Sequence, residues 1–374
     1  MKKIITLTAL LCAMCLMFSC HDTSPAPMLL NGQYVESLDE AIAAMKAGDT
    51  LQVTRDLDVE APIAVDKEIT IELLGGAKIE YDGEGSAFDI KEGGSLVIKG
   101  QSAGSGKSGM YRSSAAGGTV IEADGPVDAL FNVAYGATLE LENVTLVGQN
   151  TPNHGLIYFE NPEDVTLEPT TKVILTNVNA IADNSIICPT VHYEATDACS
   201  SVFASGCGHP MNAEIRIKGG KFVRTGTELV DGSSRKTIFI LSGKLIMEDA
   251  EVISAVTPGV EISGTKFASA YPGYYDLNVE PSVIRNCTII NTVTKEMVDA
   301  GTTNWMGAAV AASQYGEIEI EGGTYSGYYG LVTLNGAVNP DGIIDASDVE
   351  VSGIEADVFK TGGDGIISVN GTDY

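Results

Sequence analysis

Two stretches of this sequence follow one pattern: Leu141-Glu142-Asn143-Val144-Thr145-Leu146 and Ile284-Arg285-Asn286-Cys287-Thr288-Ile289. In each, Asn stands two residues after one apolar residue and three residues before another. Asn, Asp and Gly tolerate a left-handed backbone better than other residues do. The pattern therefore predicts a one-residue left-handed corner between two short strands, at which the chain bends without forming a hairpin.

The same pattern recurs along the chain with Asp or Gly at its centre, about 25 to 43 residues apart. It is accompanied by short segments of alternating apolar and polar residues, which are typical of strands with one buried face. Examples are residues 69–72, 95–99, 138–141, 214–218 and 317–321. Asn-Gly hairpin signals are scarce by comparison, and Asn335-Gly336 is one of them. The expected corners are centred on Gly75, Gly100, Asn143, Asn177, Gly219, Asp249, Asn286, Gly322 and Asp348.

One helix is expected, near the start of this region. Ser37-Leu38-Asp39-Glu40 has the form of a capping box, and apolar residues follow at helical spacing. The predicted helix covers residues 37–47, and Gly48 would end it as a C′ residue. No other helix is expected from residue 49 onward.

This combination resembles the right-handed parallel β-helix of pectate-lyase-like proteins. The resemblance covers residues 36–374 and implies an all-β fold: a single right-handed parallel β-helix of roughly ten to twelve coils. The 37–47 helix would cap its N-terminal end, as terminal repeats of solenoids must be capped. An array of β-sandwiches remains the alternative architecture.

The N-terminus predicts export. Residues 1–19 have a basic start at Lys2 and Lys3, a short apolar stretch, and the small Ser19 directly before Cys20. The segment resembles a bacterial lipoprotein signal, which implies cleavage before Cys20 and lipidation of its thiol. Residues 20–35 would then form a lipidated tether. An ordinary secretory signal is the alternative. The expected location is the outer membrane, at the cell surface or, alternatively, facing the periplasm.

Charge and hydropathy limit the partners. The chain of 374 residues has 22 Lys and Arg against 50 Asp and Glu, a formal net charge of −28. Nucleic acid is excluded as a partner because binding phosphates needs a basic face. No later segment reaches about 18 consecutive apolar residues, so a membrane contact is expected through the lipid anchor only.

Five insertions interrupt the strand pattern: residues 101–118, 183–212, 225–236, 264–276 and 291–307. The second contains Cys188, His192, Cys199, Cys207 and His209. In an exported protein, the three cysteines are disulfide candidates. Zinc binding and free thiols remain alternatives, although the spacings within this insertion follow no Cys-x-x-Cys pair. Cys287 occupies a small-residue position of the corner pattern and is expected in the core.

The motifs of known β-helical enzymes are incomplete. Arg216-Ile217-Lys218 resembles a polygalacturonase motif, but no Asp-Asp pair supplies the carboxylates that hydrolysis needs, and Gly208-His209-Pro210 matches the histidine motif only in part. The more economical interpretation of Arg216 and Lys218 is a solvated strand face.

Pectate-lyase chemistry needs Ca²⁺ and a basic residue that removes a proton. Arg224, Arg235 and Lys236 form the most basic neighbourhood, but no arginine stands in that family's motif. The glutamates of residues 317–321 are expected on a solvated face. Asp341, Asp345 and Asp348 have the spacing of no familiar Ca²⁺ loop. No metal site, cofactor or catalytic residue is assigned, and Ca²⁺ stays open.

Aromatic residues supply the candidate binding site. Tyr271, Tyr274 and Tyr275 share one insertion, Trp305 follows, and Tyr325, Tyr328 and Tyr329 come about fifty residues after the first group. Coil stacking would bring these rings to one flank, where they could stack on sugar rings or contact a protein. The alternative is that they brace loops. The expected function is a non-catalytic, adhesin-like glycan- or protein-binding module of a cell-envelope lipoprotein. A polysaccharide lyase or glycoside hydrolase acting on an extracellular glycan is the alternative.

Overall fold

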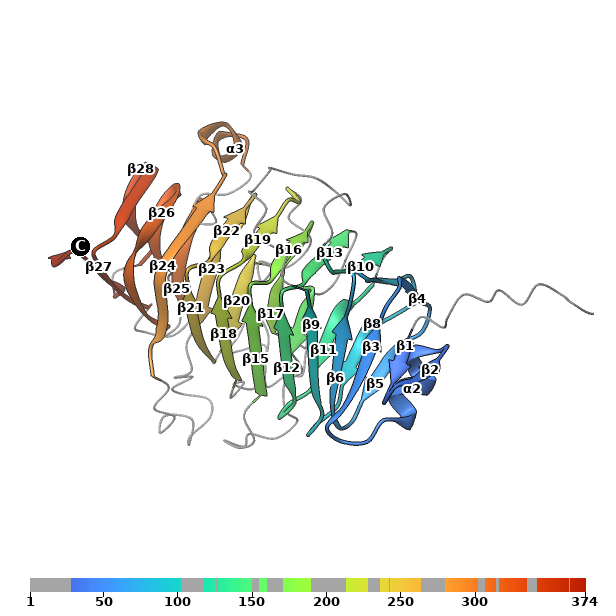
Figure 1. Ribbon diagram of the computed structural model, residues 1–374. Coiled ribbons are helices and arrows are strands. Elements are labelled where there is room, and N and C mark those ends of the chain that lie inside the picture. Colours follow the sequence, from blue (N-terminus) through green and yellow to red (C-terminus); the bar gives the residue numbers. More distant parts are fainter. Residues whose placement is uncertain are drawn as a thin grey trace, which may run out of the picture.

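Most of the chain forms short β-strands, as the alternating segments predict. The computed structural model describes residues 28–101, 118–125, 127–149, 155–159, 171–189, 213–227, 236–241, 243–263, 280–301, 307–313, 316–334, 342–362 and 364–374. Strands β3 to β23 repeat in sets of three, and each strand from β3 to β21 pairs in parallel with the strand three further along the chain. The fold is therefore all-β, and three ladders of parallel strands extend from one end of the molecule to the other (Figure 1).

The ladders are named A, B and C in the order in which the chain enters them. Ladder A contains eleven strands: β3 (Asp49–Val53), β6 (Glu68–Leu73), β9 (Ser95–Gly100), β12 (Thr138–Glu142), β15 (Thr171–Thr176), β18 (Ala213–Lys218), β21 (Lys244–Glu248), the starts of β24 (Ser282–Asn291) and β26 (Glu317–Leu334), β27 (Ile343–Ser347) and β29 (Ile366–Val369).

Ladder B follows each corner of ladder A. It consists of β4 (Leu57–Val59), β7 (Lys78–Tyr81), β10 (Val120–Asp124), β13 (Thr145–Gln149), β16 (Asn179–Ala182), β19 (Lys221–Arg224), β22 (Glu251–Ser254), the later parts of β24 and β26, and the start of β28 (Glu350–Lys360).

Ladder C closes each set of three. It consists of β5 (Ile63–Val65), β8 (Ser86–Ile90), β11 (Ala129–Val133), β14 (Ile157–Phe159), β17 (Ile187–Pro189), β20 (Ile238–Leu241), β23 (Val260–Ser263), β25 (Ala308–Ser313), and the ends of β26 and β28. β17 lies inside the predicted insertion 183–212, so that insertion begins later than expected.

The left-handed corners lie between ladders A and B. Eight of the nine predicted centres have a positive φ, from 49° at Asn286 to 69° at Gly322. Gly100 is the exception. A Cβ there would lie 2.2 Å from the carbonyl oxygen of Asn143, so glycine is required for a close backbone approach instead of a left-handed corner. The sequence pattern identified the position correctly but gave the wrong reason for it.

One continuous core fills the space between the three ladders. Inward residues of successive strands stack on each other, and Ile69, Leu96, Leu139 and Val173 in ladder A have no exposed surface. In ladder C the rings of Phe88 and Phe131 stack with centroids 5.3 Å apart. This burial supplies the main stabilisation, at about 25 cal/mol for each Å² of apolar surface removed from water.

The predicted helix is present as α2 (Leu38–Ala44), at the N-terminal end of the ladders (Figure 1). Ser37 is its N-cap and accepts a bond from the backbone N–H of Glu40. Leu38, Ala41 and Ile42 are buried in the same cluster as the core of the ladders. The helix is shorter than the predicted 37–47, and Gly48 lies beyond it in the turn that enters β3, where its φ is 85°.

An antiparallel hairpin adjoins each end of ladder A. β1 (Met28–Leu30) pairs with β2 (Gln33–Val35) and with β3, and β30 (Thr372–Asp373) pairs with β29. Asn31-Gly32 and Asn370-Gly371 form the two turns, with positive φ at both residues of each pair. The predicted tether 20–35 is therefore wrong for residues 28–35, which belong to the folded domain. Asn335-Gly336 lies outside the described residues.

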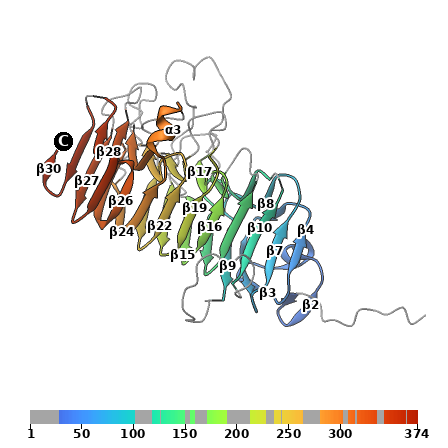
Figure 2. The same ribbon diagram turned by 90° about the horizontal axis from the view of Figure 1, so that it is seen from above.

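A second helix, α3 (Lys295–Asp299), was not predicted. Thr294 caps its N-terminus, accepting a bond from the N–H of Met297. It lies in the predicted insertion 291–307, between a strand of ladder B and one of ladder C. Figure 2 shows it on the outside of the ladders, toward the C-terminal end. Five residues give no sequence periodicity to detect, because fewer than two helical turns are present.

Candidate functional site

The outer face of ladder C differs from those of the other ladders. On ladders A and B many outward positions are charged and paired across strands, as where Arg285 contacts Glu248 and Glu321 at 3.2 and 2.8 Å. On ladder C one outward position per strand forms a single row with mixed chemistry. The ladder C row is Ala64, Asp89, Asn132, Tyr158, Cys188, Phe239, Glu261, Ala311, Val332 and Phe359.

The first half of the row, here called the open half, is partly exposed to solvent. Asp89, Asn132 and Tyr158 are each half-buried and stand on three neighbouring strands. Asn132 Nδ2 donates to Asp89 Oδ1 at 3.1 Å, and Lys91 Nζ contacts the other carboxylate oxygen. Both oxygens of Asp89 are thus engaged by protein donors, and the amide of Asn132 is held in one orientation. The half-row presents fixed polar groups beside one aromatic ring.

The second half of the row is covered. Phe239 and Glu261 are 7% and 5% exposed, and Ala311 and Val332 are fully buried. Lys236 Nζ lies 3.4 Å from Glu261 Oε2 and 5.2 Å from the centre of the Phe239 ring. Ser313 Oγ donates to Glu261 Oε1 at 3.1 Å. A paired carboxylate and ammonium therefore lie buried on the outside of the ladder, where a hydrophobic core cannot explain them.

A polar cluster fills the corner between ladders B and C near this pair. Arg224 Nη1 donates to Thr257 Oγ1 at 2.9 Å, and Asn291 Nδ2 donates to the Thr257 carbonyl at 2.6 Å. Ser254 Oγ donates to the same carbonyl at 2.5 Å. Arg224 is 2% exposed. Of the predicted basic neighbourhood, Arg224 and Lys236 are thus buried and bonded, and Arg235 lies outside the described residues.

The described part of the predicted tyrosine strip is not an exposed surface. Tyr325 lies in the core and donates its hydroxyl to the Gly322 carbonyl at 2.9 Å. Tyr328 and Tyr329 are 3% and 6% exposed; Tyr328 donates to Glu355 at 3.2 Å and Tyr329 stacks on Phe359 at 4.3 Å. These rings brace the last strands, which was the alternative interpretation. As binding residues, Tyr325, Tyr328 and Tyr329 were predicted wrongly.

Tyr271, Tyr274, Tyr275 and Trp305 lie outside the described residues. Their part of the predicted strip therefore stays a prediction.

Of the cysteines that the sequence analysis singled out, only the side chain of Cys287 lies among the described residues. Cys20, Cys199 and Cys207, with His192 and His209, lie outside the described residues, as does the side chain of Cys188, so the disulfide prediction stays open. Cys287 is fully buried, as predicted, and its thiol contacts the Arg285 carbonyl oxygen at 3.2 Å. Burial raises the pKa of this thiol to about 11, which keeps it protonated and unreactive.

Other candidate charges lie on solvated faces. Arg216 is exposed and donates to Glu214 at 2.6 Å, which also raises its pKa, and Lys218 is exposed beside it. Glu319 and Glu321 are exposed on β26, as expected. Asp345 and Asp348 are exposed, and Asp341 lies outside the described residues. Within the described ranges, no three His, Cys, Asp or Glu side chains gather as metal ligands.

Sequence reasoning did not identify Asp89, Asn132, Tyr158 or Glu261 as site residues. Each stands at an outward position of a short alternating segment, where a polar residue is ordinary. An alignment of successive strands would have found them, because these four residues fall into one row once the strands are aligned by their left-handed corners.

Comparison with known proteins adds no family to this description. No protein-family model matches the chain, and no curated protein matches its sequence. Among the described residues, no helix is both long enough and apolar enough to cross a membrane.

Proposed function

We propose that this chain is a lipid-anchored cell-envelope protein whose domain is a right-handed parallel β-helix of the pectate-lyase-like kind, and that it binds a glycan without cleaving it. The observation that carries the binding proposal is the open half of the ladder C row, formed by Asp89, Asn132 and Tyr158. The three parallel ladders and the left-handed corners support the β-helix.

The chemistry of the half-row suits a sugar chain. The half-exposed carboxylate of Asp89, held by Asn132, can accept hydrogen bonds from sugar hydroxyl groups, and a tyrosine ring offers a flat surface to the C–H face of a sugar. The three side chains stand on strands about 4.8 Å apart. A ligand that contacts all three must therefore extend along the ladder, across the strands, as an elongated chain does.

The charge of the protein narrows the ligand class. With 50 acidic and 22 basic residues, the surface repels strong polyanions at contact, since salt screens only beyond about 8 Å. A neutral or weakly charged glycan is the expected ligand. An acidic polysaccharide would need a bridging cation.

The test is a glycan array with the purified mature chain and two row variants, Asn132→Ala and Tyr158→Ala. The matched controls are Glu140→Ala and Ile174→Ala, which remove half-exposed outward side chains from ladder A one strand further along the chain. Retained binding by both controls and a tenfold or greater loss in both row variants supports the proposal. Equal binding by all four variants refutes it.

A polysaccharide lyase or hydrolase is the second candidate, favoured by the buried pair of Glu261, which belongs to the same row, and Lys236. A carboxylate and an amine 3.4 Å apart could share a proton-transfer role if a substrate reached them. Incubation with each glycan bound on the array, followed by measurement of new reducing ends and of unsaturated products, distinguishes the two candidates. Product formation that Glu261→Gln abolishes would establish the enzyme in place of the binding module.

The lipid anchor rests on residues 1–20 of the sequence. Cys20→Ala should prevent lipidation and shift the protein from the membrane fraction to the soluble fraction. Protease treatment of intact cells then separates surface display from a periplasm-facing anchor. An equal membrane-bound share for Cys20→Ala and the parent would contradict the lipoprotein assignment.

A further inference from the structure

The two ends of the core are closed differently. At the N-terminal end α2 covers the core with buried apolar side chains. At the C-terminal end ladders B and C finish on β28 (Figures 1 and 2). The inward residues of β28 remain half-exposed. Val351 is half-exposed although its neighbour Tyr325 on β26 has no exposed surface, and Val358 is half-exposed beside the buried Leu331. One further strand packed beside β28 would bury these residues.

β28 also has an unpaired edge. Among the described strands it pairs only with β26, over most of its 11 residues, and no residue of β28 is buried. Ile354 is 59% exposed, and Ile366 and Tyr374, from the neighbouring hairpin, are 50% and 56% exposed. Three of the four large apolar residues that the structure describes as exposed thus lie at this end. An edge strand with exposed apolar residues is a template for further pairing.

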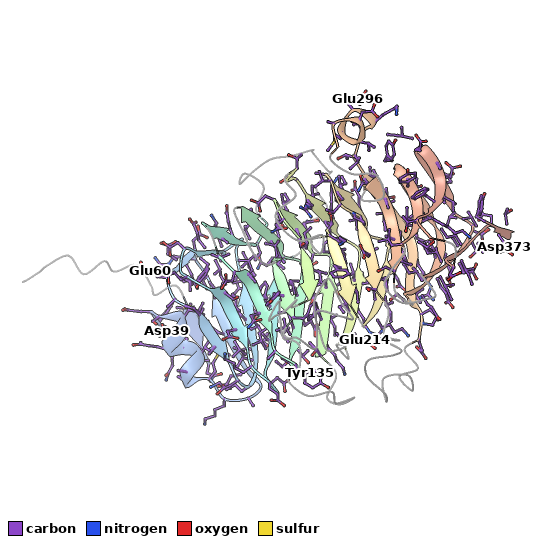
Figure 3. All side chains as sticks on the ribbon, turned by 180° about the vertical axis from the view of Figure 1, so that it is seen from behind. Asp39, Glu60, Tyr135, Glu214, Glu296 and Asp373 are labelled. Carbon is purple, nitrogen blue, oxygen red and sulfur yellow. The ribbon has the colours of Figure 1, made fainter. Side chains whose placement is uncertain are left out.

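The charge at this end determines what can pair with it. Glu350, Glu355, Asp357, Asp364 and Asp373 are exposed, and Figure 3 labels Asp373 at this end and Asp39 and Glu60 at the other. The one base of β28, Lys360, donates from Nζ to the Tyr374 carbonyl at 2.9 Å. A second copy meeting end to end would bring two such acidic edges together, which is unfavourable.

We propose that the free edge of β28 is a docking site for an extended, lysine- or arginine-bearing segment of another protein. The segment adds a strand beside β28, covers Val351, Ile354 and Val358 with its apolar side chains, and places its basic side chains against Glu350, Glu355 and Asp357. The acidic residues then make pairing selective: they repel acidic strands and copies of this chain, and attract basic strands. This surface is distinct from the half of the ladder C row that contains Asp89, Asn132 and Tyr158, so a negative result for glycan binding leaves this proposal standing, and the reverse also holds.

The test uses two synthetic 11-residue peptides of alternating sequence, Val with Lys and Val with Glu, against the full mature chain. The Val/Lys peptide should bind at least tenfold more tightly than the Val/Glu peptide, and amide hydrogen exchange in β28 should slow when it is bound. The double variant Glu355→Lys with Asp357→Lys should lose at least tenfold in affinity.

The matched control is the double variant Asp58→Lys with Glu60→Lys, which makes the same change of charge on exposed residues near the other end. Its affinity should match that of the parent. Equal loss in both double variants would show general attraction to an acidic protein and overturn the proposal. It is also overturned by unchanged exchange in β28, or by a dimer of the parent chain that Ile354→Lys abolishes, since the occupant would then be a second copy.

Discussion

The left-handed corner at Asn177 allows a quantitative test of the features that shape the fold. Asn177 has a φ of 51°, and its Nδ2 donates to Asn143 Oδ1, one corner earlier, at 3.2 Å. Replacing it with Ala puts a Cβ residue without a polar group in the left-handed region, at a cost of about 1 kcal/mol. It also removes the side-chain bond, which contributes about 1 kcal/mol. Asn177→Ala should lower the free energy of unfolding by about 2 kcal/mol.

Asn177→Gly separates the two effects, because glycine adopts this backbone without strain but also loses the side-chain bond. It should cost about 1 kcal/mol. Asn179→Ala, two residues later on an exposed position outside the left-handed region, is the control and should change stability by less than about 0.5 kcal/mol. Urea unfolding followed by circular dichroism measures all three. Equal losses for Asn177→Ala and Asn177→Gly, or a comparable loss for Asn179→Ala, would refute the reasoning.

Three further predictions concern the core and its cap. The folded state holds the Cys287 proton more tightly than the unfolded state, since burial raises the pKa from 9.0 to about 11. The stability that this difference supplies is complete below about pH 9 and is lost as the pH rises to 11. The parent should therefore lose about 2 kcal/mol of unfolding free energy between pH 9 and pH 11 that Cys287→Ala does not lose, as measured by urea unfolding at each pH. Tyr325→Phe should cost about 1 kcal/mol through the lost bond to Gly322, and an unchanged midpoint would show the bond to be irrelevant. Ile42→Ala on α2 should cost about 2–4 kcal/mol in thermal or urea unfolding if the helix seals the core, and less than about 1 kcal/mol if it does not.

The ladders could be predicted because their signals are local. A left-handed corner restricts one position to Asn, Asp or Gly, and a half-buried strand alternates apolar and polar residues. Asn143, Asn177 and Asp249 therefore mark the ends of their ladder A strands in the sequence. Asn31-Gly32 and Asn370-Gly371 are equally local turn signals, and both occur at the ends of the ladders. The repeat pattern does not predict them, because the chain forms antiparallel hairpins at the two ends of the ladders instead of repeating the corner.

The site could not be predicted in the same way because it depends on register. Asp89, Asn132 and Tyr158 are separated by 43 and 26 positions in the sequence. They become neighbours only through the register of their strands, which are joined by connections of unequal length. The burial of Tyr325, Tyr328 and Tyr329 follows from packing between the last strands, which no local pattern encodes.

The most direct test of glycan binding at the ladder C row is hydroxyl-radical footprinting of the mature chain with and without a glycan that binds it on the array. Tyr158 is half-exposed in the row. Tyr34, which is 61% exposed at the N-terminal end of the ladders, serves as the internal reference. The account predicts that the glycan slows oxidation of Tyr158 several-fold and leaves Tyr34 unchanged. Unchanged oxidation of Tyr158 under saturating glycan would contradict it.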